Sequence, residues 1–123
     1  MAARRQQRPA LRAAPSAAIE AIWRTVAALP RGSVSTYGAV AARAGLPRRA
    51  RLVGHALKVA PRALELPWHR VVGAGGRIAF APGSANAREQ RRRLSAEGVE
   101  VARGRVRLPP APNLDALLWG RAR

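Results

Sequence analysis

The segment LPWHRVVGAGG, residues 66–76, holds the side chains of this chain that look best suited to chemistry. It places His69 between Trp68 and Arg70, ahead of a short apolar run and a glycine-rich turn. A histidine at a functional site often activates a neighbouring nucleophile. No cysteine, serine or carboxylate stands beside His69 in this segment. The question that the segment raises is why a tryptophan occupies a position suited to a nucleophile.

The overall charge indicates a polyanionic partner. The 123 residues include 23 Lys and Arg against 6 acids, which gives a formal net charge of +17. Nucleic acid is the commonest partner of so basic a chain. A GC-rich coding sequence would explain why arginine replaces lysine, but it would not explain the shortage of acids.

The absence of cysteine excludes several kinds of site. It rules out disulfides, thiolate catalysis and cysteine-based zinc sites. Two histidines and 6 scattered acids leave little for any other metal site. We therefore expect neither a metal nor a cofactor.

The length and the apolar pattern predict one domain at residues 16–123, preceded by a flexible basic tail at residues 1–15. No apolar run approaches the ~20 residues that a membrane-spanning helix needs. In the tail, Arg12 and Pro15 interrupt what would be the apolar part of a secretory signal. A transit peptide remains an alternative for the tail. We expect a monomeric cytoplasmic protein without a membrane partner, associated with the nucleoid when it is bound to DNA.

Helical spacing of apolar residues, together with capping and breaking residues, predicts the elements that position residues 66–76. Ser16, Ser84 and either Ser35 or Thr36 are suitable N-caps, and Gly98 is suitable as the residue after a helix end. The second and third helices have the proportions of a helix-turn-helix. The segments predicted to contain helices are residues 16–30, 37–46, 48–60, 83–98 and 113–120.

Two hairpins are predicted beside these helices. Strands Arg70–Val72 and Arg77–Phe80 would pair around the turn GAGG as a small wing. A second hairpin would span residues 99–108, with its turn at Arg103–Gly104, and the LPPAP segment would follow as a linker. The expected fold class is mainly α with small β-hairpins, in a winged helix-turn-helix arrangement.

Three motifs occur in the order LPRGSVSTYGAVAARAGLPRRARLVGHAL, PWHRVV and LSAEGV. With these motifs, residues 19–101 resemble the DNA-binding domain of the O6-alkylguanine-DNA alkyltransferase family. In that family the second motif reads Pro-Cys-His-Arg, and its cysteine accepts the alkyl group. Trp68 stands at this cysteine position, as in the alkyltransferase-like proteins of the family. Because alkyl transfer needs an activated soft nucleophile, we expect no catalytic residue and no enzyme activity.

The resemblance implies a set of DNA-binding residues on the helix-turn-helix. Tyr37 matches the tyrosine that helps to rotate the target nucleotide, and Arg51 matches the arginine that fills the gap in the base stack. Gly54 interrupts a helix at a cost of up to ~1 kcal/mol, which favours close approach of DNA or of the next element. The alternatives are a merely half-buried Tyr37 and a generic phosphate contact for Arg51. The implied DNA-binding set is Thr36, Tyr37, Arg51, Gly54 and Lys58.

The same resemblance implies a pocket for the flipped base and a structural relay behind it. Trp68 would form the pocket floor, and a hydrogen bond between His69 and Glu97, direct or through water, would fix that floor. Arg70 would make a structural ion pair or hydrogen bond. The chain departs from the family pattern at Ala60, where an asparagine is usual, and at Ala81 and Pro82, where tyrosine and serine are usual. The implied pocket residues are Tyr37, Leu57, Trp68, Val71 and Ala81.

The sequence thus predicts a non-enzymatic DNA-damage sensor. It would flip O6-alkylguanine out of double-stranded DNA, hold it, and flag it for nucleotide-excision repair proteins. The alternative is a winged-helix regulatory or architectural DNA-binding protein without lesion specificity. A residual alkyltransferase or a glycosylase is the third possibility, and product formation would reveal it.

Overall fold

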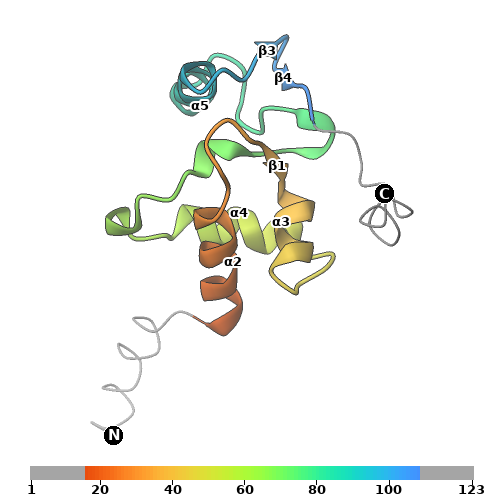
Figure 1. The fold of residues 1–123 in the computed structure, drawn as a ribbon, viewed down its shortest axis with the longest axis vertical. Coiled ribbons are helices and arrows are strands. Elements are labelled where there is room, and N and C mark those ends of the chain that lie inside the picture. Colours follow the sequence, from red (N-terminus) through yellow and green to blue (C-terminus); the bar gives the residue numbers. More distant parts are fainter. Residues whose placement is uncertain (1–15, 109–123) are drawn as a thin grey trace, which may run out of the picture.

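The structure, a computed structural model, describes residues 16–108. The predicted basic tail, most of the LPPAP linker and the predicted helix at 113–120 lie outside the described residues. Figure 1 shows α2 (Ala17–Ala27), α3 (Tyr37–Arg43) and α4 (Ala50–Lys58) grouped together. At the other end lie α5 (Ala85–Ala96) and the strands β3 (Val101–Ala102) and β4 (Arg105–Val106). Within residues 16–108, no helix is both long and apolar enough to cross a membrane.

Three helices begin at the predicted N-caps. The hydroxyls of Ser16, Thr36 and Ser84 accept hydrogen bonds from the amide three residues further on, at 3.1, 3.0 and 3.2 Å. Each bond satisfies a backbone N–H that has no partner within its helix. The prediction for the start of α4 was wrong by two residues. Arg48 adopts a left-handed conformation with φ 68°, so the helix begins at Ala50.

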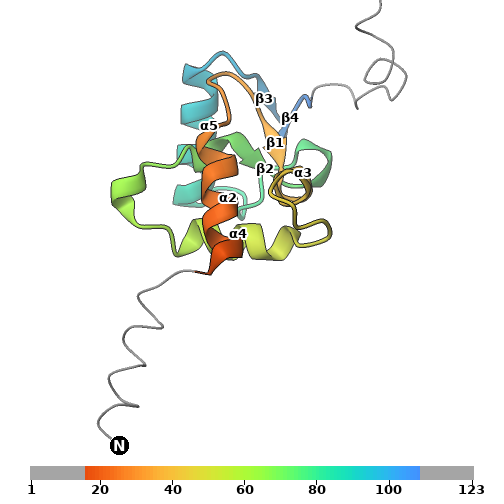
Figure 2. The ribbon, with the colours of Figure 1, turned by 60° about the horizontal axis from the view of Figure 1, so that its bottom comes forward.

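The first apolar cluster joins the three N-terminal helices. Ile22 and Val26 of α2, Val40 of α3 and Val53 of α4 have no exposed surface. Figure 2 shows α2 next to both helices of the helix-turn-helix. The indole Nε1 of Trp23 on α2 also donates a 2.8 Å hydrogen bond to the Ala56 carbonyl of α4. The orientation of α4 is therefore set by a buried core and by one directional bond.

The predicted wing hairpin at residues 70–80 is wrong. β2 (Val71–Val72) pairs in parallel with β1 (Ser35–Thr36), which precedes α3. The turn η3 (Ala74–Gly76) follows β2, and the Gly73 amide donates a 2.7 Å bond to the Arg77 carbonyl. Both residues of β2 are fully buried, which requires packing on both faces. A strand covered in this way takes its partner from far along the chain.

The second predicted hairpin is confirmed. β3 (Val101–Ala102) and β4 (Arg105–Val106) are antiparallel, and Arg103 and Gly104 between them have φ values of 54° and 76°. Two successive left-handed residues are the mark of the tight turn that suits the twist of a hairpin. Arg77 forms an isolated bridge to Arg105, which attaches the segment after η3 to this hairpin. A second apolar cluster, with Val72, Ile78, Ala87, Leu94 and Val106 buried, holds this end of the molecule together.

The end of α5 also follows the prediction. Gly98 has φ 83°, and its amide and the Val99 amide donate hydrogen bonds to the carbonyls of Ser95 and Leu94. This pattern is a Schellman motif, in which a left-handed residue closes the helix. It leaves Glu97 at the C-cap, where its side chain turns toward the 68–70 segment.

Candidate nucleic-acid interface

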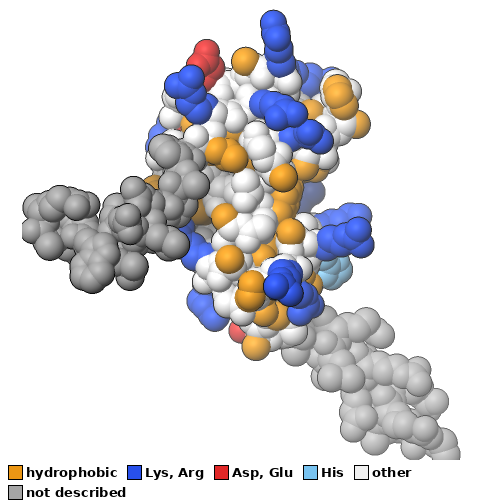
Figure 3. Space-filling model, turned by 90° about the vertical axis from the view of Figure 1, so that its right-hand side faces the viewer, with side chains coloured by type: hydrophobic (Ala, Val, Ile, Leu, Met, Phe, Trp, Pro, Cys, Tyr) orange, Lys and Arg blue, Asp and Glu red, His pale blue; other side chains and the backbone are white. Residues whose placement is uncertain are grey.

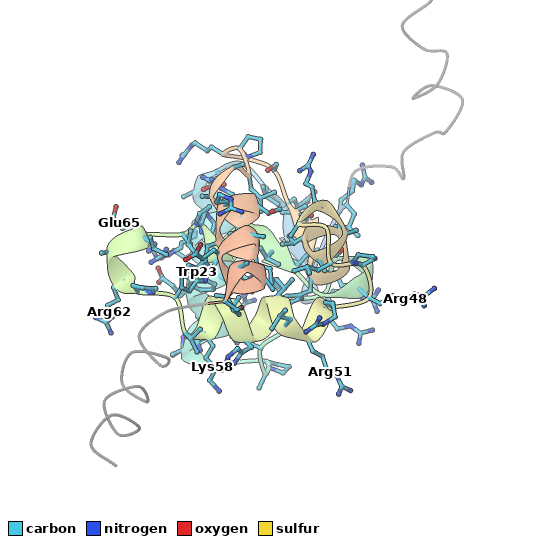
Figure 4. All side chains as sticks on the ribbon, turned by 90° about the horizontal axis from the view of Figure 1, so that it is seen from below. Trp23, Arg48, Arg51, Lys58, Arg62 and Glu65 are labelled. Atoms are coloured by element: carbon cyan, nitrogen blue, oxygen red, sulfur yellow. The ribbon has the colours of Figure 1, made fainter. Side chains whose placement is uncertain are left out.

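One face of α4 carries three of the five residues that were predicted to contact DNA. Arg51, Gly54 and Lys58 lie at helical spacing, on the side opposite the buried Val53 and Ala56. Figure 4 shows Arg51 and Lys58 pointing the same way from this helix. The sequence of α4 contains no acidic residue. The face is therefore positively charged, and it has no side chain at Gly54.

His55 shares this exposed face, and the sequence interpretation missed it. Its position four residues after Arg51 was a sufficient signal, because residues at this spacing lie on the same side of a helix. We call Arg51, Gly54, His55 and Lys58 the basic face of α4.

Gly54 has no packing partner within the described structure. A Cβ placed on it would meet no atom within 4 Å, so the next element of the fold does not require a glycine here. The expectation of close approach by the next element is therefore wrong. The expectation of close approach by DNA stays a prediction.

Thr36 and Tyr37 stand at the junction of β1 and α3. The Thr36 hydroxyl is occupied as the N-cap acceptor for Ala39. Tyr37 is half-buried and packs against the first apolar cluster. Burial raises the pKa of its phenol, which therefore stays protonated at neutral pH and can donate a hydrogen bond.

Trp68 lines a hollow of about 490 Å³ beside the end of α4. We call it the Trp68 hollow. It brings together two of the predicted pocket residues, Leu57 and Trp68, with the loop that follows α4. Val71 is fully buried in the core, Tyr37 packs against that core, and Ala81 lines a different hollow. The residues lining the Trp68 hollow are Leu57, Ala60, Pro61, Arg62, Glu65, Leu66, Trp68 and Arg93.

The indole of Trp68 is held from two sides. The Phe80 ring meets it edge-on, with ring centroids 5.9 Å apart. The guanidinium of Arg93 lies 5.3 Å from the indole centroid, and its Nε donates a 2.6 Å bond to Glu89. A cation over an indole face is an attractive arrangement. The sequence interpretation missed Arg93, because only the fold brings α5 against residue 68.

The predicted link between His69 and Glu97 is present as a direct bond of 2.7 Å. Arg70 donates to the same carboxylate at 2.7 and 3.0 Å, and the Gly32 amide donates at 2.9 Å. These contacts, with Arg70 the strongest, hold the pKa of Glu97 well below its usual range despite its burial. An ionised carboxylate can only accept, so the Nε2 of His69 carries a hydrogen.

This network of hydrogen bonds fixes the position of the 68–70 segment. Arg70 also donates a 2.8 Å bond to the Leu29 carbonyl, so it ties together the end of α2, the end of α5 and the turn that carries Trp68. The Nε2 of His69 is engaged with Glu97, and its neighbour Trp68 has no proton that a base could usefully remove. The network therefore fixes the position of the turn that carries Trp68 relative to α2 and α5.

The chain matches the family model described as 6-O-methylguanine DNA methyltransferase, DNA binding domain, over residues 17–99. It belongs to this family, and its mainly helical fold, with two small sheets within residues 16–108, is the fold of that domain. Within the family it is similar to the alkyltransferase-like proteins, and the chain contains no cysteine that could accept an alkyl group.

Two curated relatives are similar to the chain. The chain is 49% identical over 81 residues to the "DNA base-flipping protein" of Escherichia coli. The matched residues make up 66% of this chain and 61% of that protein. It is 38% identical over 101 residues to "Alkyltransferase-like protein 1" of Schizosaccharomyces pombe. This match covers 80% of this chain and 90% of that protein. The match thus spans about six tenths of the E. coli protein and most of the S. pombe protein.

Solved structures give the same result. The chain resembles S. pombe Atl1 in complex with damaged DNA containing O6-carboxymethylguanine, with a TM-score of 0.65 and 37% identity over 75% of this chain and 88% of that chain. It also resembles Mycobacterium tuberculosis OGT in complex with DNA, with a TM-score of 0.59 and 32% identity over 68% of this chain and 51% of that chain.

Proposed function

We propose that this protein binds duplex DNA, flips an O6-alkylguanine out of the base stack and holds it without chemical change. The observation that carries the proposal is the Trp68 hollow, which opens where an alkyltransferase would present its cysteine and which contains no thiol. Its volume of about 490 Å³ falls within the range of about 300–1,000 Å³ that is usual for small-ligand pockets.

In this proposal the basic face of α4 lies in the minor groove. Gly54 lets the helix backbone approach the sugar-phosphate chain, and Lys58 contacts phosphate. Thr36 and Tyr37 lie against the backbone of the target nucleotide. Arg51 fills the space that the flipped base leaves, because a planar guanidinium can stack on bases and donate hydrogen bonds at once. Flipping costs a few kcal/mol, which these contacts must offset.

The flipped base would enter the Trp68 hollow beside Leu57. The indole offers an apolar surface to the alkyl group, and Arg93 and Phe80 keep the indole in one orientation. The relay of His69 and Glu97 would support the floor.

We further propose that the complex on DNA is a signal for nucleotide-excision repair proteins. A bound protein that cannot remove the lesion must leave it to other enzymes. In this proposal the protein acts as a monomer and lies on the nucleoid of the cell when it is bound to DNA. The complexes with DNA among the similar structures support DNA as the partner.

Replacing Arg51 tests this function against a regulatory DNA-binding role. Arg51→Ala is expected to lower the ratio of affinities for duplexes with O6-methylguanine and with guanine by about tenfold, which corresponds to about 1.4 kcal/mol. Fluorescence anisotropy with the two labelled duplexes measures this ratio. Arg43→Ala is the matched control, because Arg43 is an exposed arginine at the end of α3 and away from the basic face of α4.

A regulatory or architectural protein would behave differently. Loss of the Arg51 charge would then weaken binding to both duplexes by the same factor and leave their ratio unchanged. That outcome would contradict the proposed lesion recognition. The departures at Ala81 and Pro82 are the features that favour this alternative.

A further inference from the structure

A second hollow lies at the end of the molecule away from α3 and α4. It has a volume of about 670 Å³ and is enclosed by the segment after η3, the first half of α5 and the turn of the β3–β4 hairpin. We call it the wing hollow. It shares no lining residue with the Trp68 hollow or with the helix-turn-helix. Its lining residues are Arg77, Ile78, Ala79, Phe80, Ala81, Pro82, Gly83, Ala87, Arg91 and the turn 103–105.

The rim of the wing hollow is strongly basic. Arg77, Arg91, Arg103 and Arg105 all line it, and no acidic residue does. Within residues 16–108, the carboxylates that form ion pairs are Glu89 and Glu97, and their partners are other side chains. Figure 3 shows several Lys and Arg side chains at the upper end of the molecule, together with exposed hydrophobic side chains and an acidic one. Four like charges around one hollow favour an anionic occupant.

The floor of the wing hollow is apolar. Ile78 and Ala87 are buried beneath it, and Phe80, Ala81 and Pro82 complete it. A DNA phosphate would match the arginines but would leave this floor uncovered. The chain's own residues 109–123 include apolar side chains, but they carry one acid against two arginines and would not neutralise the rim. An occupant must supply both negative charge and an apolar group.

We propose that the wing hollow is a docking site for an acidic segment of a partner protein, with one apolar anchor residue placed among the acids. Anchors of this kind fill a central pocket, while charged groups at the rim give orientation and speed of association. The site goes beyond the DNA-binding function proposed above and does not depend on it. It would allow a second protein to bind without occupying the basic face of α4.

Phe80 connects this docking site to the Trp68 hollow. The residue lines the wing hollow, and its ring also contacts the indole of Trp68. An anchor residue in the wing hollow would therefore contact the same side chain that holds the Trp68 indole.

The test uses two labelled pentapeptides and the full chain. Fluorescein-labelled Asp-Asp-Phe-Asp-Asp is expected to bind, and Asp-Asp-Gly-Asp-Asp is expected to bind more weakly because it lacks the anchor. Arg91→Glu and Arg105→Glu should each weaken binding of the first peptide by about fivefold or more. Arg92→Glu, which makes the same charge change on the exposed side of α5, should leave it unchanged. Circular dichroism checks that all variants are folded.

Four results would overturn the proposal. The phenylalanine peptide could fail to bind, or could bind Arg91→Glu and Arg92→Glu equally well. Arg91→Glu could weaken binding to an unmodified duplex as much as Arg51→Glu does, which would make the hollow a DNA contact. Trp119→Ala could tighten peptide binding, which would show that the chain's own C-terminal segment occupies the hollow. Lesion preference is measured separately with DNA, so failure here leaves the proposed function standing.

Discussion

At the scale of single residues, Trp68 and Glu97 explain how a repair scaffold becomes a binding site. Trp68 replaces the acceptor with a large apolar surface, held by Phe80 and Arg93. Glu97 gathers three donors, from His69, Arg70 and Gly32, behind the turn that carries this tryptophan. In the proposed function, these hydrogen bonds fix the position of the turn that carries Trp68.

Glu97→Gln is expected to destabilise the fold and to change its pH dependence. Arg70 would remain largely buried without its anionic partner, which costs about 3 kcal/mol in the free energy of unfolding at neutral pH. In the native protein the pKa of Glu97 is depressed, so its contribution is present above the unfolded pKa of about 4.3 and is lost as the pH falls below it. Urea denaturation from neutral to acidic pH measures both effects.

The variant should therefore be less stable at neutral pH and less sensitive to acid than the native protein. The Glu89 carboxyl, whose pKa is lowered to about 2 by Arg92 and Arg93, titrates in both proteins and is unaffected by the substitution. Equal steepness of the two pH profiles would contradict a stabilising role of the Glu97 charge.

At the scale of elements, the sequence predicted the helix ends and the turn that depend on interactions between neighbouring residues. The N-caps at Ser16, Thr36 and Ser84, the left-handed Gly98 and the turn of the β3–β4 hairpin are interactions between near neighbours in the chain. Each was predicted because its residues have specific capping or turn preferences, with Thr36 as one of two candidates beside Ser35.

Pairings between distant segments could not be predicted in this way. Val71 and Val72 read as one arm of a hairpin, but their partner β1 lies on the far side of the helix-turn-helix in the sequence. The family resemblance supplied Arg51, Gly54 and Lys58 of α4, and helical spacing from Arg51 would have added His55, which was overlooked. The contact between Arg93 and Trp68 depends on how α5 packs against the 68–70 segment, which the sequence pattern does not show. The same packing leaves Val71 and Ala81 outside the lining of the Trp68 hollow.

Gly54→Ala should stabilise the free protein and weaken its binding to DNA. Alanine in the middle of α4 meets open space and gains up to ~1 kcal/mol of helix stability over glycine. The added methyl group would hold the helix away from the minor groove, so we expect affinity for duplex DNA to fall by about tenfold. Thermal unfolding and anisotropy on the same sample measure the two effects. Unchanged DNA affinity would show that Gly54 does not face the duplex.

Gly76→Ala should disrupt the attachment of η3 to β4. Gly76 has φ 86°, and a Cβ there would overlap the carbonyl oxygen of Val106. Gly83→Ala is the matched control, because Gly83 has φ 80° and open space around it. The control should lose only about 1–2 kcal/mol of unfolding free energy, because its alanine adopts a left-handed backbone. Gly76→Ala should lose more than the control, because its Cβ also meets the Val106 carbonyl oxygen. Equal unfolding midpoints in urea would contradict this packing.

At the scale of the whole molecule, the net charge and the shape of the surface have different roles in the proposed DNA binding. The net charge of +17 supplies attraction to any duplex, and this part of the affinity weakens steeply as salt rises. The Trp68 hollow and the basic face of α4 would supply the preference for a damaged base. The wing hollow, built from other elements, leaves a separate surface for a partner protein.

The most direct test of the proposed lesion binding compares two labelled duplexes that differ only in one base, guanine or O6-methylguanine, at low and at moderate salt. We expect tighter binding to the modified duplex at both salt concentrations. The affinity for each duplex should fall as salt rises, while the ratio of the two affinities stays the same. We also expect the methyl group to stay on the DNA that is recovered from the complex. Equal affinity for the two duplexes, or loss of the methyl group from the recovered DNA, would contradict the proposed function.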